Sequence, residues 1–140
     1  DGVDDVVSTN ELVPKGSPHT VFIDFELGKT AMEQDERIYL GGRLYIHNAN
    51  DLAYVESTNT HFSTKFRAGH HKIYLSTSGK DDETAVLYHN GIKYTPSDPG
   101  RNSDLIAMSN IRQEGMKKIN KFIIWNRQLT EQEITQLMEV

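Results

Sequence analysis

The chain has 140 residues and a net charge of −5, and its 36% hydrophobic and 25% charged content is ordinary for one soluble globular domain. Its 15 basic residues are scattered, which argues against nucleic acid as a partner, and no apolar run approaches the roughly 18 residues of a membrane span. Because cysteine is absent, disulfides, thiolate catalysis and cysteine zinc sites are excluded.

Short β-type runs occupy most of the chain. In the run 21–27, Ile23, Phe25 and Leu27 fall on one face and acidic residues on the other, which is typical of a half-buried strand. The further predicted strands, in chain order, are 37–40, 43–47, 52–55, 72–76, 84–89, 105–108 and 119–125.

Turn residues separate these runs. Gly41-Gly42 and Asn48-Ala49-Asn50-Asp51 are good hairpin turns, because Gly, Asn and Asp tolerate positive φ. Asn90-Gly91 is the strongest hairpin signal, since a type I′ turn needs positive φ at both central residues. Many short strands with no long helical segment predict an antiparallel β-sandwich.

The chain ends in a predicted strand, a turn and a short helix. Thr130 and Glu133 form a Ser/Thr-x-x-Glu capping box that opens the helix. Ile134, Leu137 and Met138 then recur at three- and four-residue spacing, so we expect one apolar helix face to dock on the sheet.

Four ordered patterns resemble laminin-G-like domains of the concanavalin A-like lectin/glucanase superfamily. They are Asp1-Gly2-Val3-Asp4-Asp5-Val6, His70-His71-Lys72-Ile73-Tyr74-Leu75, Leu87-Tyr88-His89-Asn90-Gly91-Ile92, and a closing pattern of Ile119-Asn120, Ile124-Trp125-Asn126-Arg127, Leu129-Thr130, Glu133-Ile134 and Leu137. The resemblance implies a two-sheet antiparallel jelly-roll β-sandwich with a short C-terminal helix, as a single domain over 1–140. It also implies that the chain begins inside a first strand, so we expect the parent protein to continue upstream.

Catalytic carboxylate patterns of this fold class are not matched. Residues 33–37 come close to the Glu-x-Asp-x-Glu strand of glucanases, but the third carboxylate falls one residue early and would point to the opposite face. Asp24 and Glu26 share a strand face without a third acid, and the Gln-x-His pattern of jelly-roll lyases is missing. We therefore expect no enzyme, with a glycoside hydrolase or lyase as the least favoured reading.

Metal sites have limited support. His70 and His71 are neighbours on a strand, so they point to opposite faces and cannot share one ion. A structural calcium remains an alternative because loop carboxylates suit hard cations, and Asp4 and Asp5 are its best ligands, since this doublet matches the family's opening pattern. No other cofactor is expected.

Sugar binding needs aromatic surfaces beside polar side chains. Tyr45 and His47, with Asn48, Asn50 and Asp51 in the following turn, are the predicted ligand-binding residues. The resemblance instead assigns Trp125 to packing.

The expected function is non-catalytic, lectin-like recognition of a carbohydrate or cell-surface glycan by a bacterial or phage surface protein. Such a protein could be a tail fibre, tailspike or adhesin, placing the chain outside the cell or on the virion surface; the missing cysteines favour this source. The alternative is a structural module that assembles a homo-oligomer, such as a trimer, without binding glycan.

Overall fold

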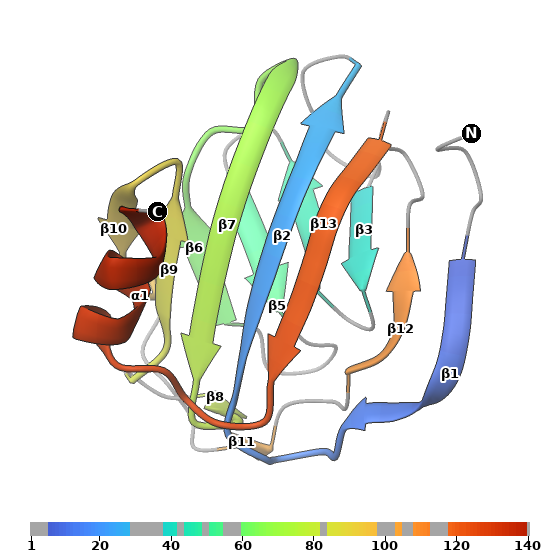
Figure 1. Ribbon diagram of the computed structural model, residues 1–140, viewed down its shortest axis with the longest axis vertical. Coiled ribbons are helices and arrows are strands. Elements are labelled where there is room, and N and C mark those ends of the chain that lie inside the picture. The colour runs from blue at the N-terminus through green and yellow to red at the C-terminus, as the bar shows by residue number, and fades with distance from the viewer. Residues whose placement is uncertain are drawn as a thin grey trace.

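The computed structural model describes residues 6–28, 38–41, 44–48, 51–54, 60–81, 84–97, 103–104, 108–112 and 118–139. Within these ranges the chain is all-β apart from one short helix (Figure 1). Asp4, Asp5 and Asn50, and the carboxylate-rich segment 33–37, lie outside the described residues.

A five-stranded antiparallel sheet forms the front layer in Figure 1. β2 lies between β7 and the edge strand β13, and β10 forms the opposite edge. In sheet order the strands are β10 (Ile92–Tyr94), β9 (Val86–His89), β7 (Gly69–Thr77), β2 (His19–Leu27) and β13 (Lys118–Trp125).

A four-stranded antiparallel sheet lies behind the first, with two small strand pairs beside them (Figure 1). Its strands follow chain order: β3 (Ile38–Gly41), β4 (Leu44–Asn48), β5 (Asp51–Tyr54) and β6 (Thr60–Ser63). The small pairs join β1 (Val6–Val13) to β12 (Met108–Arg112), and β8 (Lys80–Asp81) to β11 (Ser103–Asp104).

The main core contains side chains from both large sheets. Ile23 and Phe25 of β2 meet Leu44 and Leu52 of the four-stranded sheet in one buried cluster. The strand alternation predicted for 21–27 is confirmed, because its odd-numbered positions are buried in this cluster while Asp24 and Glu26 face outward. Side chains that alternate in this way leave a second, outer face on the five-stranded sheet.

The turn predictions agree with the structure where it describes them. Asn90 and Gly91 have φ of 50° and 85°, and Ile92 pairs with His89, so the predicted tight hairpin is confirmed. β4 and β5 also form the expected hairpin. Of the strand predicted at 105–108 the structure describes Met108 alone, which begins β12, and β12 runs on to Arg112; residues 105–107 lie outside the described residues.

Helix α1 (Glu131–Met138) covers part of the outer sheet face (Figure 1). Both halves of the predicted capping box are present: the Glu133 N–H donates to the Thr130 hydroxyl at 3.2 Å, and the Thr130 N–H donates to the Glu133 carboxylate at 3.1 Å. Ile134 is fully buried, but Leu137 is 37% exposed. The apolar helix face therefore docks firmly at its start and incompletely at its end.

Two buried hydroxyls anchor the turn that precedes α1. The Thr20 hydroxyl donates to the Arg127 carbonyl at 3.0 Å and accepts from the Leu129 N–H at 2.8 Å. The Ser76 hydroxyl donates to the Leu129 carbonyl at 2.8 Å. The two central strands β2 and β7 thus satisfy the backbone of this turn and fix where the helix begins.

Candidate functional site

Strand register arranges the outer sheet face in rows. Ile123, Phe22, Tyr74 and Tyr88 are successive cross-strand partners, so they form one apolar row across four strands. Two residues further along β13, Trp125 begins the next row. Rows on one face of a sheet are spaced by two residues, or roughly 7 Å.

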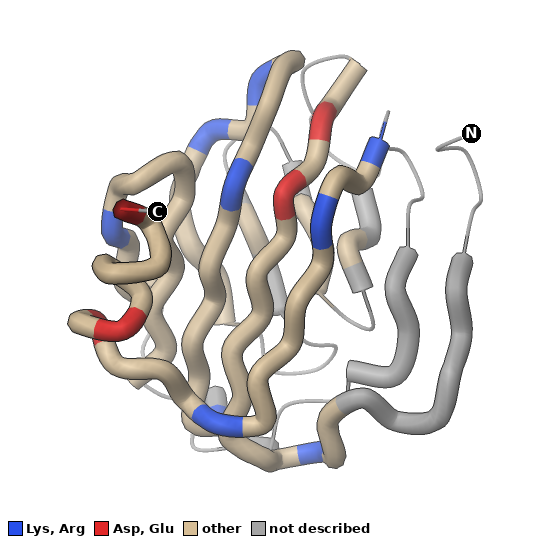
Figure 2. The backbone as a smooth tube through the Cα atoms, viewed as in Figure 1, with Lys and Arg blue, Asp and Glu red and all other residues tan. Residues whose placement is uncertain are grey.

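A polar row lies on the other side of the apolar row. Asp24 on β2 is the direct partner of Lys121 on β13 and of Lys72 on β7. Asn90, in the hairpin turn, continues the row: its N–H donates to the Lys72 carbonyl at 2.9 Å, and its side-chain oxygen accepts from the Lys72 N–H at 2.8 Å. Figure 2 shows this pattern as acidic residues on β2 between basic residues on β7 and β13.

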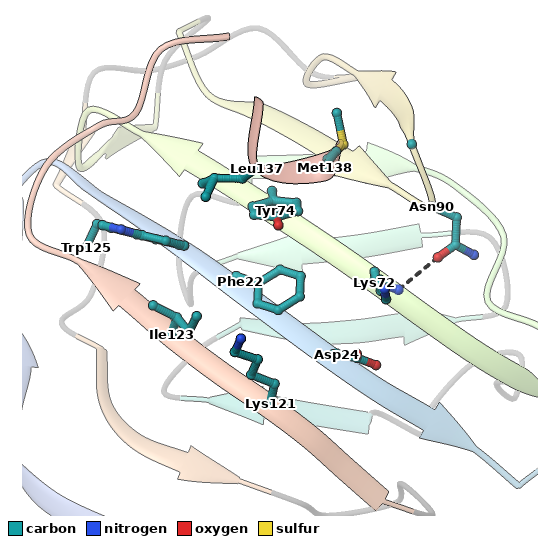
Figure 3. Close-up of a pocket in the computed structure, with 11 residues that line it drawn as sticks. Phe22, Asp24, Lys72, Tyr74, Asn90, Lys121, Ile123, Trp125, Leu137 and Met138 are labelled. Atoms are coloured by element: carbon teal, nitrogen blue, oxygen red, sulfur yellow. Dashed lines mark hydrogen bonds between the residues drawn. The ribbon is translucent and has the colours of Figure 1, made fainter. Parts of the chain in front are cut away.

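These rows and the helix enclose a groove of about 430 Å³. Phe22 and Tyr74 form its floor, with ring centroids 4.5 Å apart. The end of α1 forms one wall and β13 the other, and the polar row lies at the end opposite Trp125 (Figure 3). The full lining is Phe22, Asp24, Lys72, Tyr74, Asn90, Gly91, Lys121, Ile123, Trp125, Leu137 and Met138.

The Asp24 carboxylate is ionised and already engaged. Its partial burial acts to raise its pKa, but hydrogen bonds from His70 and Asn120, and the electrostatic effects of His70 and then Lys72, outweigh burial and hold the pKa below its ordinary value. Both hydrogen bonds go to Oδ1, and the side chain is 17% exposed. Asp24 is thus a largely covered charge, whereas Lys72 and Lys121 are exposed.

The arrangement is that of a small-molecule site: an apolar, aromatic floor with a few polar groups at one end. Its volume lies in the usual range of about 300–1,000 Å³ for such sites. Burial raises the pKa of the Tyr74 hydroxyl, so this group is a neutral hydrogen-bonding partner at neutral pH. The groove thus presents aromatic rings along its floor and two exposed lysines at its polar end.

The predicted opposite orientation of His70 and His71 is confirmed. His70 lies on the outer face beside Asp24, and His71 is buried in the core side of the same strand. Among the described residues, no group of three or more His, Asp or Glu side chains is placed to hold a metal ion. The calcium prediction at Asp4 and Asp5 lies outside those residues and stays a prediction.

His71 forms a buried hydrogen-bonded chain that the sequence did not predict. Its Nε2–H donates to the Arg67 carbonyl at 2.6 Å, which leaves Nδ1 of the neutral ring to accept from His89 Nε2–H at 2.8 Å. The Thr64 hydroxyl in turn donates to His89 Nδ1 at 2.5 Å. Burial, and secondly the neighbouring His71, lower the pKa of His89 to about 4, and burial also lowers the pKa of His71.

The sequence-predicted binding residues do not lie in this groove. A sugar-binding aromatic must be exposed, but Tyr45 is 4% exposed; its neighbours Leu44 and Ile46 are also buried, because both faces of β4 are covered at this point. His47 and the turn residues around 48–51 belong to the β4–β5 hairpin of the other sheet, and the structure describes only the backbone of His47, Asn48 and Asp51.

The groove residues were missed because the sequence does not reveal cross-strand register. Trp125 was assigned to packing, and it does pack on the outer apolar cluster, but it is only half-buried and also lines the groove. The alternation of β2 had already placed Asp24 on an outward face. That outward position was the one available signal, and the strands that flank Asp24 follow only from the pairing of β2 with β7 and β13.

Comparison with protein-family models, curated proteins and solved structures finds no match to this chain. The laminin-G-like resemblance therefore stays a prediction. No helix in the described ranges is long and apolar enough to cross a membrane.

Proposed function

We propose that this chain is a non-catalytic, lectin-like carbohydrate-recognition domain and that the outer groove is its sugar site. The observation that carries the proposal is the combination of an aromatic floor with exposed polar side chains at one end of the groove. Pyranose rings have an apolar face of C–H groups, which packs on aromatic rings, and hydroxyl edges that need hydrogen-bonding partners. Trp125, Tyr74 and Phe22 supply the aromatic rings. Lys72, Lys121 and Asn90 supply the hydrogen-bonding partners for the hydroxyls.

The carboxylates of the groove support recognition without catalysis. Glycoside hydrolysis commonly needs two carboxyl groups across the scissile bond. Among the described residues that line the groove, Asp24 is the one carboxylate, and its Oδ1 is engaged by His70 and Asn120. A bound sugar would be held and not cleaved.

The proposal includes the jelly-roll connectivity that the laminin-G-like resemblance implies. Two antiparallel sheets with a common core and a closing helix after β13 support it. On the same resemblance we place the domain in a bacterial or phage surface protein, such as a tail fibre, tailspike or adhesin, outside the cell or on the virion.

A glycan array followed by isothermal titration calorimetry tests the proposal. We expect at least one bacterial surface polysaccharide to bind, and Trp125→Ala to abolish binding while Trp125→Phe retains part of it. Ile92→Ala is the matched control, because Ile92 is 59% exposed on β10 and does not line the groove. Absence of binding to any glycan would overturn the proposal. A stable trimer by light scattering that Trp125→Ala dissociates would instead support the structural alternative.

A further inference from the structure

Two exposed ammonium groups flank the polar end of the groove. Lys72 is on β7 and Lys121 is on β13, the two strands that neighbour β2 in the sheet. The two lysines therefore lie on either side of Asp24. Neighbouring strands are about 4.8 Å apart, so the Cα atoms of the two lysines are roughly 10 Å apart. Lysine side chains of four methylene groups can therefore converge on one ligand group between them.

The charge of this row is positive although the chain as a whole is acidic. Two lysines and one aspartate leave the row one net positive charge, whereas the whole chain carries −5. Within the described residues neither ammonium makes a hydrogen bond or an ion pair within 4 Å, although the Lys72 charge acts on Asp24 over a longer distance, so each keeps its donors for a ligand. The local charge complements an anion.

Asp24 is a poor partner for a ligand amine. Its side chain is 17% exposed, and His70 and Asn120 already donate to Oδ1. A cationic sugar would have to approach between two exposed ammonium groups to reach it. The exposed charges thus select against an amino sugar and in favour of an acidic one.

We propose that the ligand of the groove is an acidic saccharide, whose ring stacks on the aromatic floor and whose carboxylate binds Lys72 and Lys121. This inference rests on the proposed function and names its ligand class. Ammonium–carboxylate hydrogen bonds are charge-assisted and stronger than bonds to neutral hydroxyls. An uronic acid and a sialic acid both carry the required carboxylate on a pyranose ring.

Calorimetry with matched acidic and neutral sugars tests the inference. The probes are trigalacturonate against its carboxyl-reduced analogue, and sialyllactose against lactose. We expect at least one acidic probe to bind about tenfold or more tightly than its neutral partner. Raising salt from about 0.05 M to about 0.5 M should weaken that acidic probe only, because salt screens exposed charges.

Lysine variants assign the effect to this row. Lys72→Gln and Lys121→Gln should each weaken the acidic probe about tenfold and the neutral probe far less, because glutamine keeps an N–H donor for a hydroxyl but loses the charge. Lys118→Gln is the matched control, since Lys118 is an exposed lysine of the same strand that pairs with Glu26 and does not line the groove. Thermal melts establish that each variant is folded.

The outcomes separate the two proposals. Equal binding of acidic and neutral sugars that Trp125→Ala abolishes would overturn the inference and leave the proposed function standing. Binding of no saccharide would overturn both. Tight, Trp125-dependent binding of a poly-glutamate peptide together with no binding of the acidic sugars would identify the ligand as an acidic peptide and overturn the inference.

Discussion

The buried pair of His71 and His89 should make the stability of the fold depend on pH in a narrow window. His89 is 5% exposed, and its pKa of about 4 lies below the value of 6.5 expected in the unfolded chain. As the pH falls, the unfolded chain takes up the proton first, so the free energy of unfolding falls from pH 6.5 towards pH 4. Between about pH 7.5 and about pH 5, His89 alone should cost about 2 kcal/mol.

Urea unfolding at several pH values measures this loss. His71 and His19 also have a pKa lowered chiefly by burial, so they add to the slope in the same direction. Glu133 and Asp24 have a lowered pKa as well, but as carboxyls they titrate below this window. Measurements above about pH 5 therefore report on the histidines.

The variant His89→Gln isolates the contribution of His89. Glutamine retains a donor for His71 and an acceptor for Thr64 but does not titrate. We expect the slope of the free energy against pH to fall by up to about 1.4 kcal/mol per pH unit, the effect of one proton. Ile134→Val is the control, because a buried, non-titrating change lowers stability at every pH and leaves the slope intact. An unchanged slope in His89→Gln would refute the reasoning.

Four further changes test the contacts that hold the helix and one loop. Thr130→Ala removes the cap oxygen and should cost about 1 kcal/mol of unfolding free energy in urea. Deletion after Leu129 should lower the melting temperature further than Thr130→Ala does, since it removes the buried Ile134. A deletion variant that melts like the parent would contradict this. Thr20→Val leaves the Arg127 carbonyl and the Leu129 N–H without their partner and should cost roughly 1–3 kcal/mol by the same assay, whereas no loss would show that water replaces the hydroxyl. Gly79→Ala should cost about 1–3 kcal/mol in thermal melts, because φ is +88° and a Cβ would lie 2.5 Å from the Ser17 carbonyl oxygen; a variant as stable as the parent would mean that this loop yields freely.

Local signals in the sequence predicted most of the secondary structure. The alternation around Ile23, the Asn90-Gly91 hairpin and the capping box at Thr130 each depend on residues close together in the chain, and all three are confirmed. Short strands without such local signals were less predictable. Strand β6 lacks a run of β-branched residues, and it forms because it pairs along the length of β5.

The groove could not be predicted from the same signals. Its polar row joins Asp24, Lys72 and Lys121, which are far apart in sequence and become neighbours only through the pairing of β13, β2 and β7. The His71–His89 chain has the same origin, since pairing of β7 with β9 brings the two rings together. A single sequence indicates which side chains face outward but not which of them share a row.

The two hydroxyl anchors of the turn before α1 determine where the groove can adapt its width. Thr20 and Ser76 tie this turn to central strands, and the first helical turn is capped, whereas Leu137 near the other end of the helix remains 37% exposed. Helix ends open more readily than strands bonded within a sheet. A broad ligand would therefore be admitted by fraying of the last helical turn while β13 stays in place. Amide hydrogen exchange should accordingly be slow at Ile134 and fast near Met138. A bound ligand should slow exchange near Met138 far more than at Ile134.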